Sequence, residues 1–503
     1  MLSNKKLIDL DQLIKKKLQL SINQKNYDLA LRLIELSAHL QYNYCFNESW
    51  YDKELEGSLK QIADLHLATQ TISPQKDVIM FYDYFGYDNR GLTQQYLRAL
   101  KKLNKKIILV FENEGRYYKN EAILSEIKDY AHKEIYYLNG ETRIDKAENL
   151  FNIILSVKPE SILMHLIPWD TIAYLAFYKI KGITRYQINL TDQAFWLGVD
   201  ITDINIGFRS YGLNLSEQFR NIPKQKNKLL PYYPILSSSS FQGFDFETKD
   251  KKIIFAGSTL YKVLGNKLEF FETIHRLLNI NKNLIFVLAG SGNADAITKF
   301  IDDNNLNNRI FLIGDRYDLF EIMKKVDYYI ATFPFAGALM TQIAAEADLP
   351  IFLYVKENCQ YNDIKDLFYK TDNLKNFDNL DNLIENFTQE YKQGGKRISY
   401  KDSMITEAEF AENLDRIFNN ENPMEFLEKR ENVENSVVTY NALTLESENL
   451  YNPSYQKTID NYLSHWEKFK IFPEYRNDYY KKLLKEDKLK FAKTLYYQIT
   501  GKI

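Results

Sequence analysis

The spacing of hydrophobic residues changes near residue 77. Before that point apolar side chains recur every three or four positions, as in YDLALRLIELSAHL (27–40), which predicts amphipathic helices. After it come short apolar runs separated by gaps long enough for helices, which predicts alternating strands and helices. The first runs are DVIMFYDYF (77–85), KIILVFEN (106–113), KEIYYLNG (133–140) and SILMHL (161–166). We therefore expect a helical segment, residues 1–75, followed by an α/β domain, residues 76–220.

Uninterrupted apolar runs of this kind are typical of parallel strands buried on both faces, with helices as crossovers. Three prolines and four serines interrupt the alternation and predict a linker, residues 221–250. Five further apolar runs and four helical patterns predict a second α/β domain, residues 251–375. Residues 376–503 are expected to be mainly helical and to pack back across both domains. The predicted fold class is α/β, with two Rossmann-like doubly wound domains.

Four turns of the second domain are candidates for one binding cleft, because the carboxyl ends of parallel strands share an edge of the sheet. They are FAGSTLYK (255–262), AGSGNA (289–294), GDRYDL (314–319) and PFAGALMT (334–341). Glycines let backbone N–H groups approach a phosphate, and a helix that begins at Gly337 adds the positive end of its dipole. The candidate donor-binding residues are Ser258, Thr259, Lys262, Gly290, Asp315, Arg316, Gly337, Ala338, Leu339, Met340, Thr341 and Gln342.

Within that set, Thr341 and Gln342 are neutral donors where a carboxylate would repel a diphosphate. Lys262 is either the point charge that neutralises a leaving pyrophosphate or a solvated surface lysine. Arg316 is a candidate contact for a base, whereas Asp315 is either a ligand contact or a helix cap.

In the first domain His165 and Asp192 each follow an apolar run, so both are candidate catalytic bases at a strand end. The alternatives are a structural, hydrogen-bonded histidine and an aspartate that caps the next turn. Candidate acceptor-binding residues lie at the mouth of the first sheet, where polar donors suit a hydroxyl-rich ligand or simply begin a helix. These residues are Asn89, Arg90, Gly91 and Gln94.

Charge and composition narrow the partners. The chain has 65 basic and 67 acidic residues, so no global positive field favours nucleic acid. Cys45 and Cys359 lie far apart and the histidines occur singly, which predicts neither a disulfide framework nor a metal site and favours the cytoplasm. The first helix has an apolar stripe beside three lysines, so it either lies on a membrane surface or packs on its own domain.

Particular segments carry a resemblance to GT-B glycosyltransferases, over roughly residues 77 to 355. DQAFWLG (192–198), DINIGFRSYG (203–212), GSTLYK (257–262) and FPFAGALMTQIAAEADLPI (333–351) resemble bacterial glycosyltransferases of capsule and other surface-polysaccharide loci. TLYK is also similar to the pyrophosphate-lysine segment of the O-GlcNAc transferase group. The resemblance implies transfer of a sugar from a nucleotide sugar, in particular a UDP-sugar, to a glycan, lipid-linked or protein acceptor. It implies no metal or other cofactor, and a place in the cytoplasm or at the inner membrane face.

By the same resemblance Lys262 contacts the donor diphosphate, residues 337–342 hold its phosphates, and Arg316 lies by the base. The sequence departs from the pattern in two places. Phe335 and Ile343 replace the glutamate pair of retaining members, and Ala338, Leu339 and Met340 replace the His–Thr–Thr phosphate grip. We therefore expect an inverting reaction with His165 or Asp192 as base. The alternatives are a GT-B-like nucleotide-sugar epimerase and a non-catalytic sugar-nucleotide-binding partner of another transferase.

Overall fold

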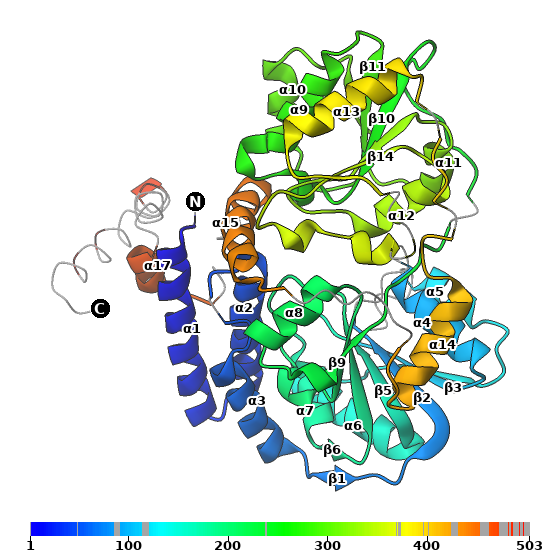
Figure 1. The fold of residues 1–503 in the computed structure, drawn as a ribbon. Helices are drawn as coiled ribbons and strands as arrows, with labels where there is room; N and C mark the ends of the chain where they lie inside the picture. The colour runs from blue at the N-terminus through cyan, green and yellow to red at the C-terminus, as the bar shows by residue number, and fades with distance from the viewer. Residues whose placement is uncertain are drawn as a thin grey trace.

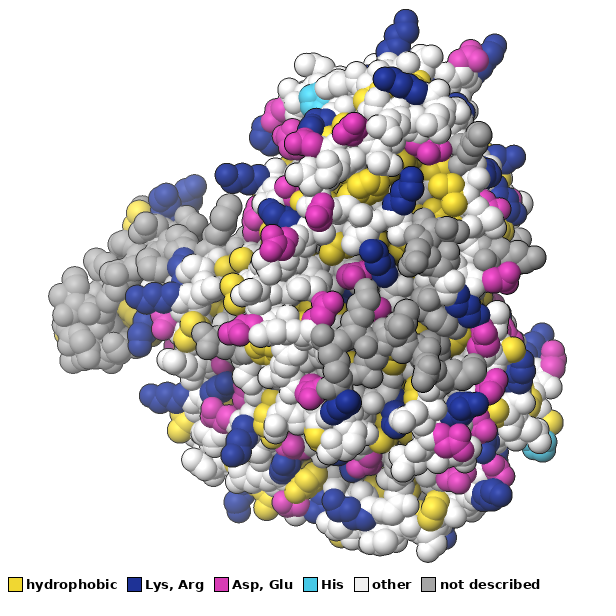
Figure 2. Space-filling view, in the orientation of Figure 1, with side chains coloured by type: hydrophobic (Ala, Val, Ile, Leu, Met, Phe, Trp, Pro, Cys, Tyr) yellow, Lys and Arg dark blue, Asp and Glu magenta, His cyan; other side chains and the backbone are white. Residues whose placement is uncertain are grey.

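The computed structural model places two α/β domains one above the other, with N-terminal helices along one side (Figure 1). It describes residues 2–47, 49–84, 91–112, 120–236, 239–368, 370, 374–395, 397–400, 402–423, 431–452 and 462–471, with a few single residues beyond. Within the described residues, no helix is both long enough and apolar enough to cross a bilayer. Basic and acidic side chains are interspersed on the face shown in Figure 2.

The N-terminal segment consists of α1 (Asn4–Asn23), α2 (Tyr27–Tyr44) and α3 (Lys53–His66), so the predicted helices are confirmed. The apolar stripe of α1 packs against α2 and is fully buried. Its members are Leu7, Leu10, Ile14 and Leu18. Lys15, beside the stripe, pairs with Asp11 and Asp52 at 3.0 and 2.6 Å. Because this face already lies in the core, the membrane-surface interpretation of α1 is wrong.

The first domain is built on a seven-stranded parallel sheet with the order β4-β3-β2-β5-β7-β8-β9. Its strands are β2 (Gln75–Asp83), β3 (Lys106–Phe111), β4 (Lys133–Tyr137), β5 (Pro159–His165), β7 (Thr184–Asn189), β8 (Ile204–Gly207) and β9 (Asn227–Leu229). Its helices are α4 (Leu92–Lys102), α5 (Glu121–Glu126), α6 (Arg143–Val157), α7 (Thr171–Tyr178) and α8 (Ser210–Phe219). A separate parallel pair joins β1 (Gln70–Thr71) to β6 (Ile180–Lys181). The predicted doubly wound domain is confirmed.

The assignment of residues 221–250 to a linker is wrong in one part. Strand β9 lies inside this range and extends the first sheet by pairing with β8. It has three residues, between lysine-rich and proline-rich neighbours, so its apolar signal is too short to separate from a loop.

The second domain has a six-stranded parallel sheet with the order β12-β11-β10-β13-β14-β15. Its strands are β10 (Lys252–Gly257), β11 (Leu284–Ala289), β12 (Ile310–Leu312), β13 (Tyr328–Ile330), β14 (Ile351–Tyr354) and β15 (Asn376–Phe377). Its helices are α9 (Glu269–Leu278), α10 (Asp295–Asp303), α11 (Leu319–Met323), α12 (Ala338–Glu346) and α13 (Leu380–Lys392). The domain therefore continues beyond the predicted boundary at residue 375, because the two-residue β15 and α13 complete it.

Short 3₁₀ helices connect these elements. They are η2 (Val199–Ile201), η3 (Lys224–Lys226), η4 (Leu260–Val263), η5 (Asn266–Leu268), η6 (Gln360–Asn362) and η7 (Lys365–Phe368).

The C-terminal helices return to the first domain. Phe410 of α14 (Glu407–Phe418) packs on Tyr96 of α4, with ring centroids 5.1 Å apart. Helix α15 (Glu434–Tyr451) lies between the domains beside α2, and α17 (His465–Ile471) lies beside α1 (Figure 1). Side chains from the N-terminal segment, both domains and α15 form one buried cluster. Its buried members are Cys45, Trp50, Ala194, Tyr211, Leu215, Phe335, Cys359, Tyr361, Val433, Val437 and Tyr440.

The carboxyl ends of the two sheets meet at the interface between the domains. Arg209, just after β8, donates to the carbonyls of Tyr361 and Asp363, which follow β14. Gln342 of α12 donates to the carbonyl of Tyr232 in the segment after β9. Loops that follow strands of both sheets therefore contact each other at the domain interface.

Candidate functional site

On the first-domain side, a carboxylate and an imidazole lie together at the centre of the sheet. Asp83 ends β2, His165 ends β5, and the two residues are register partners in adjacent strands. His165 Nδ1 lies 3.0 Å from Asp83 Oδ1, and the Thr93 hydroxyl of α4 donates to Asp83 Oδ2 at 2.9 Å. Both ring and carboxylate are buried. The strand order reverses between β2 and β5, which is where open α/β sheets bind ligands.

This arrangement determines how the imidazole is held. When Asp83 accepts the hydrogen on Nδ1, Nε2 is the nitrogen with a lone pair for a proton. His165 therefore lies where the sequence predicts it, with an orienting carboxylate that sequence reasoning missed. The available signal is the aspartate that ends the apolar run DVIMFYD.

The predicted acceptor residues fall partly outside the described part of the chain. Asn89 and Arg90 are not described, so their assignment stays a prediction. Gly91 has φ of +74° and precedes α4, where a left-handed residue lets the chain turn into the helix. Gln94 is buried in the first turn of α4. The two described members thus lie next to Thr93, which contacts Asp83.

Asp192 does not have the environment of a catalytic base. Its side chain is fully buried, and its two oxygens accept from Arg209 Nε and Nη2 at 2.6 and 2.9 Å. The guanidinium also binds two carbonyls of the second domain, so the pair links the domains. A Cβ on Gly212 would lie 2.5 Å from the Asp192 Cβ, so the carboxylate is also closely packed. The geometry therefore supports a structural role for Asp192 and leaves His165 as the candidate base.

On the second-domain side, the predicted turns converge. Ser258 N donates to Ala289 O at 2.9 Å, and Gly290 N donates to Gly314 O at 2.8 Å. Gly290 has φ of +141°, and a Cβ there would lie 1.8 Å from the Ser258 carbonyl oxygen. Gly337 approaches from the β13 side, since its Cβ would lie 3.2 Å from Gly257 O. All four turns therefore border one edge of this sheet.

Lys262 lies beside the start of α12. Its Nζ donates to Ala336 O at 3.2 Å, and its carbonyl accepts from Phe335 N at 3.3 Å. The first N–H groups of α12 have no acceptor within the helix, and no side chain among the described residues caps them. Ala338, Leu339 and Met340 of this turn are partly exposed. A lysine and a helix N-terminus therefore lie together, an arrangement that suits an anion such as phosphate.

Two donors predicted on α12 face inward instead. Thr341 and Gln342 are fully buried. The Thr341 hydroxyl donates to Gly337 O at 3.0 Å, and the Gln342 amide donates to Tyr232 O at 2.8 Å. Their prediction as phosphate donors is not supported, because a helix turns each successive side chain by 100° and these two point to the core. Ser258 Oγ, also predicted, is buried and has no hydrogen-bond partner within the described chain.

The predicted base contact, Arg316, is engaged elsewhere. It forms a bidentate ion pair with Asp318, both contacts at 2.7 Å, and donates to Gly243 O at 3.0 Å. The Arg316 side chain therefore binds the linker between the domains, at Gly243, to the turn at 314–319. Its neighbours Asp315 and Tyr317 are exposed, Tyr317 by 69%. The exposed Tyr317 ring thus lies at the turn where the sequence predicts that Arg316 contacts a base. Thr259, in the turn at 255–262, is exposed as well.

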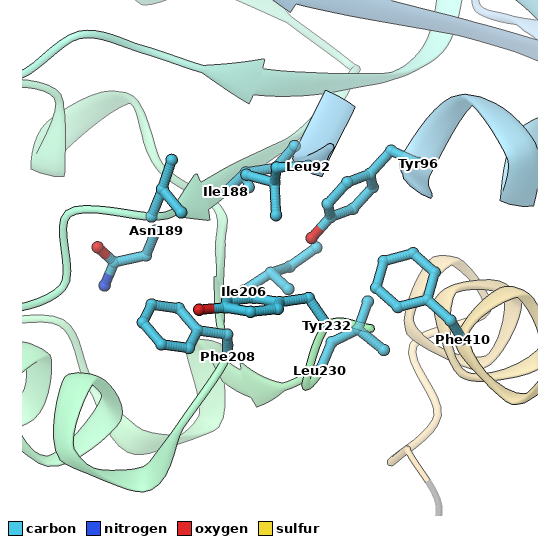
Figure 3. Close-up of a pocket in the computed structure, with 10 residues that line it drawn as sticks. Leu92, Tyr96, Ile188, Asn189, Ile206, Phe208, Leu230, Tyr232 and Phe410 are labelled. Atoms are coloured by element: carbon cyan, nitrogen blue, oxygen red, sulfur yellow. The ribbon is translucent and has the colours of Figure 1, made fainter. Parts of the chain in front are cut away.

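A small apolar cavity of about 10 Å³ lies near the carboxyl ends of β7 and β8 (Figure 3). Its lining residues are Leu92, Tyr96, Ile188, Asn189, Leu190, Ile206, Phe208, Leu230, Tyr232 and Phe410. The Tyr96 hydroxyl points into it, and burial raises the pKa of this phenol. The space suits about one water molecule. The cavity is therefore too small to hold a sugar.

Two facing doubly wound parallel sheets, with C-terminal helices that return to the first domain, define the GT-B fold class. The sequence matches no protein-family model and no curated protein. Among solved structures, Anabaena Alr3699/HepE in complex with UDP and glucose is similar, with a TM-score of 0.52 and 11% identity. It covers 68% of this chain and 99% of that chain.

Two other solved structures align less well. S. aureus TarM, solved with fondaparinux, α-GlcNAc-glycerol and UDP, has 10% identity and a TM-score of 0.45, and covers 75% of this chain and 99% of its own. A UDP-N-acetylglucosamine 2-epimerase has 10% identity and a TM-score of 0.44, over 69% of this chain and 95% of its own. At such identities the likeness to HepE shows the fold alone.

Proposed function

We propose that this protein is a glycosyltransferase that moves a sugar from a UDP-sugar to an acceptor hydroxyl. The observation that carries the proposal is the Asp83–His165 pair at the reversal point of the first sheet. A general base there would border the same cleft as the phosphate-binding features of the second domain. HepE, a similar fold, was solved with UDP and glucose, which supports this class of donor.

In the proposed donor site, Lys262 and the first N–H groups of α12 bind the diphosphate. Lysine supplies a positive point charge, and the helix N-terminus supplies backbone donors and the dipole. The stabilisation of the leaving UDP then falls to these groups rather than to a metal ion. We place the uracil ring of UDP at the turn 314–317. The exposed Tyr317 ring there can stack on the uracil, whereas the Arg316 side chain is already bound to Asp318.

In the proposed reaction the acceptor hydroxyl oxygen forms a bond to the anomeric carbon while the bond from that carbon to the diphosphate oxygen breaks. The hydroxyl proton passes to His165 Nε2, and Asp83 stabilises the resulting imidazolium through Nδ1. UDP leaves with the bonding electron pair toward Lys262. Because base and leaving group would lie on opposite sides of the sugar, inversion is expected. The resemblance of residues 192–198 and 203–212 to surface-polysaccharide transferases favours a glycan acceptor.

The test combines binding and turnover in the full chain. Calorimetry with UDP, GDP and CMP, and mass spectrometry of a UDP-sugar panel with glycan acceptors, should show UDP binding and transfer. Lys262→Ala should weaken UDP binding at least tenfold, whereas His165→Ala should keep UDP binding and lose transfer. The exposed Lys282→Ala and His132→Ala serve as controls.

Three results would contradict the proposal. If the wild-type chain binds none of these nucleotides, the assigned donor site is refuted. If His165→Ala transfers the sugar at the full rate, His165 is not the catalytic base. Conversion of the UDP-sugar to its epimer without an acceptor would favour the epimerase alternative.

A further inference from the structure

An unusual backbone segment follows the turn that carries Lys262. Asn266, Lys267 and Leu268 all have left-handed φ values, of 46°, 55° and 62°, and Gly265 before them has 101°. Three successive non-glycine residues in this region carry a conformational cost, because the Cβ atom crowds the following carbonyl. Such a run persists only where surrounding groups hold it.

The side chain that holds this run comes from α15. Glu446 Oε2 accepts from Asn266 N at 2.9 Å, and Glu446 Oε1 accepts from Lys267 N at 2.8 Å. Both carboxylate oxygens are thus used on consecutive backbone N–H groups, about 180 residues away along the chain. Hydrogen bonds to an ionised carboxylate are shorter and stronger than neutral ones.

Helix α15 also contacts the backbone on the N-terminal side of Lys262. The Ser447 hydroxyl donates to Tyr261 O at 2.7 Å, directly before Lys262. Tyr451 packs where a Cβ on Gly292 would lie, at 2.6 Å, so the helix also covers the β11–α10 turn. α15 therefore fixes the backbone on both sides of Lys262, while it packs against α2 of the N-terminal segment.

We propose that Glu446 is a positioning residue for the donor site. By holding the left-handed turn at 266–267, it keeps η4 in the position from which Lys262 reaches the start of α12. The inference rests on the proposed function, in which Lys262 binds the diphosphate. Glu446 itself contacts backbone amides, so its influence on a ligand passes through Lys262.

A purely structural cap would act differently. It would lower the thermal stability of the chain and leave the affinity for UDP unchanged in the folded protein. A positioning residue lowers that affinity, and its effect disappears once Lys262 is removed, because the two substitutions then act through one contact.

The experiment is calorimetric titration of the full chain with UDP, well below the melting temperature measured by circular dichroism. Glu446→Ala should bind UDP at least tenfold more weakly than wild type. Glu446→Gln keeps one oxygen that can accept but places an NH2 group toward the second backbone N–H, so it should lose less affinity than Glu446→Ala and still bind more weakly than wild type. Glu434→Ala removes an exposed charge from the same helix and should bind as wild type does.

The double variant Lys262→Ala/Glu446→Ala should bind UDP no more weakly than Lys262→Ala alone. Wild-type affinity in Glu446→Ala, or multiplied losses in the double variant, would overturn the inference. If Glu446→Ala does not fold, Glu446→Gln takes its place in the cycle. It should bind UDP measurably more weakly than wild type, and either an unchanged affinity or a loss that multiplies with that of Lys262→Ala would overturn the inference. A wild-type chain that binds no UDP would instead refute the proposed function on which the inference rests.

Discussion

The buried ion pair between Asp192 and Arg209 offers a sharp test of how the domains are held. Replacing Arg209 by Met keeps a long apolar stem and removes the guanidinium. The Asp192 carboxylate, which is fully buried, then has lost both N–H donors, at 2.6 and 2.9 Å. The carbonyls of Tyr361 and Asp363 lose their contacts as well, at 2.8 and 3.0 Å.

The expected magnitude follows from the uncompensated charge. Removing one partner of a buried pair costs about 3–5 kcal/mol, because the remaining ion stays desolvated. The whole unfolding free energy of a domain is about 5–15 kcal/mol, so Arg209→Met should be severely destabilised. Replacing both partners, as Asp192→Leu/Arg209→Met, should restore part of that loss, since the Asp192 carboxylate is then no longer buried without its N–H donors. The recovery should be incomplete, because the buried Arg220 guanidinium loses the nearby negative charge of Asp192.

The assay is urea unfolding at pH 7 followed by circular dichroism. Arg276→Met is the matched control, because its pair with Asp381 is exposed, 51% and 76%. Exposed pairs contribute about 0–1 kcal/mol. If Arg209→Met lost no more unfolding free energy than Arg276→Met, the interpretation of Asp192 as an interdomain anchor would be refuted.

Two further substitutions test local features. Gly290→Ala would place a Cβ 1.8 Å from Ser258 O at a φ of +141°, so it should weaken UDP binding at least tenfold in calorimetry. Gly57→Ala, with nothing within 4 Å, should change neither UDP binding nor fold; equal binding by both variants would contradict the close approach. Burial raises the pKa of Asp170 to about 8, so the folded chain keeps a proton between about pH 4 and 8 that the unfolded chain loses. Stability should fall as pH rises through this window, and Asp170→Asn should flatten the fall in pH-dependent urea titrations; an unchanged slope would assign it to another group.

Much of the fold is predictable because hydrophobic periodicity is local. A helix or strand that buries one face or both has a hydrophobic pattern that is visible within about ten residues. Both domains, the N-terminal helices and the strand ends can therefore be predicted from the sequence alone. The same logic places His165 at a strand end and Lys262 just past the turn that follows a strand. It fails for β9 and β15, which have three and two residues and are stabilised by pairing with a longer neighbour.

The roles of polar side chains were decided by the tertiary structure. Asp192 and Asp83 both end apolar runs, and nothing local separates an anchor from an orienting carboxylate. The distinction comes from partners 17 and 82 positions away, Arg209 and His165. Sequence by itself determined which segments are buried and where the carboxyl ends of the strands lie. Only the assembled chain decided which polar atoms satisfy one another, because hydrogen-bond partners depend on distances in space that chain spacing does not encode.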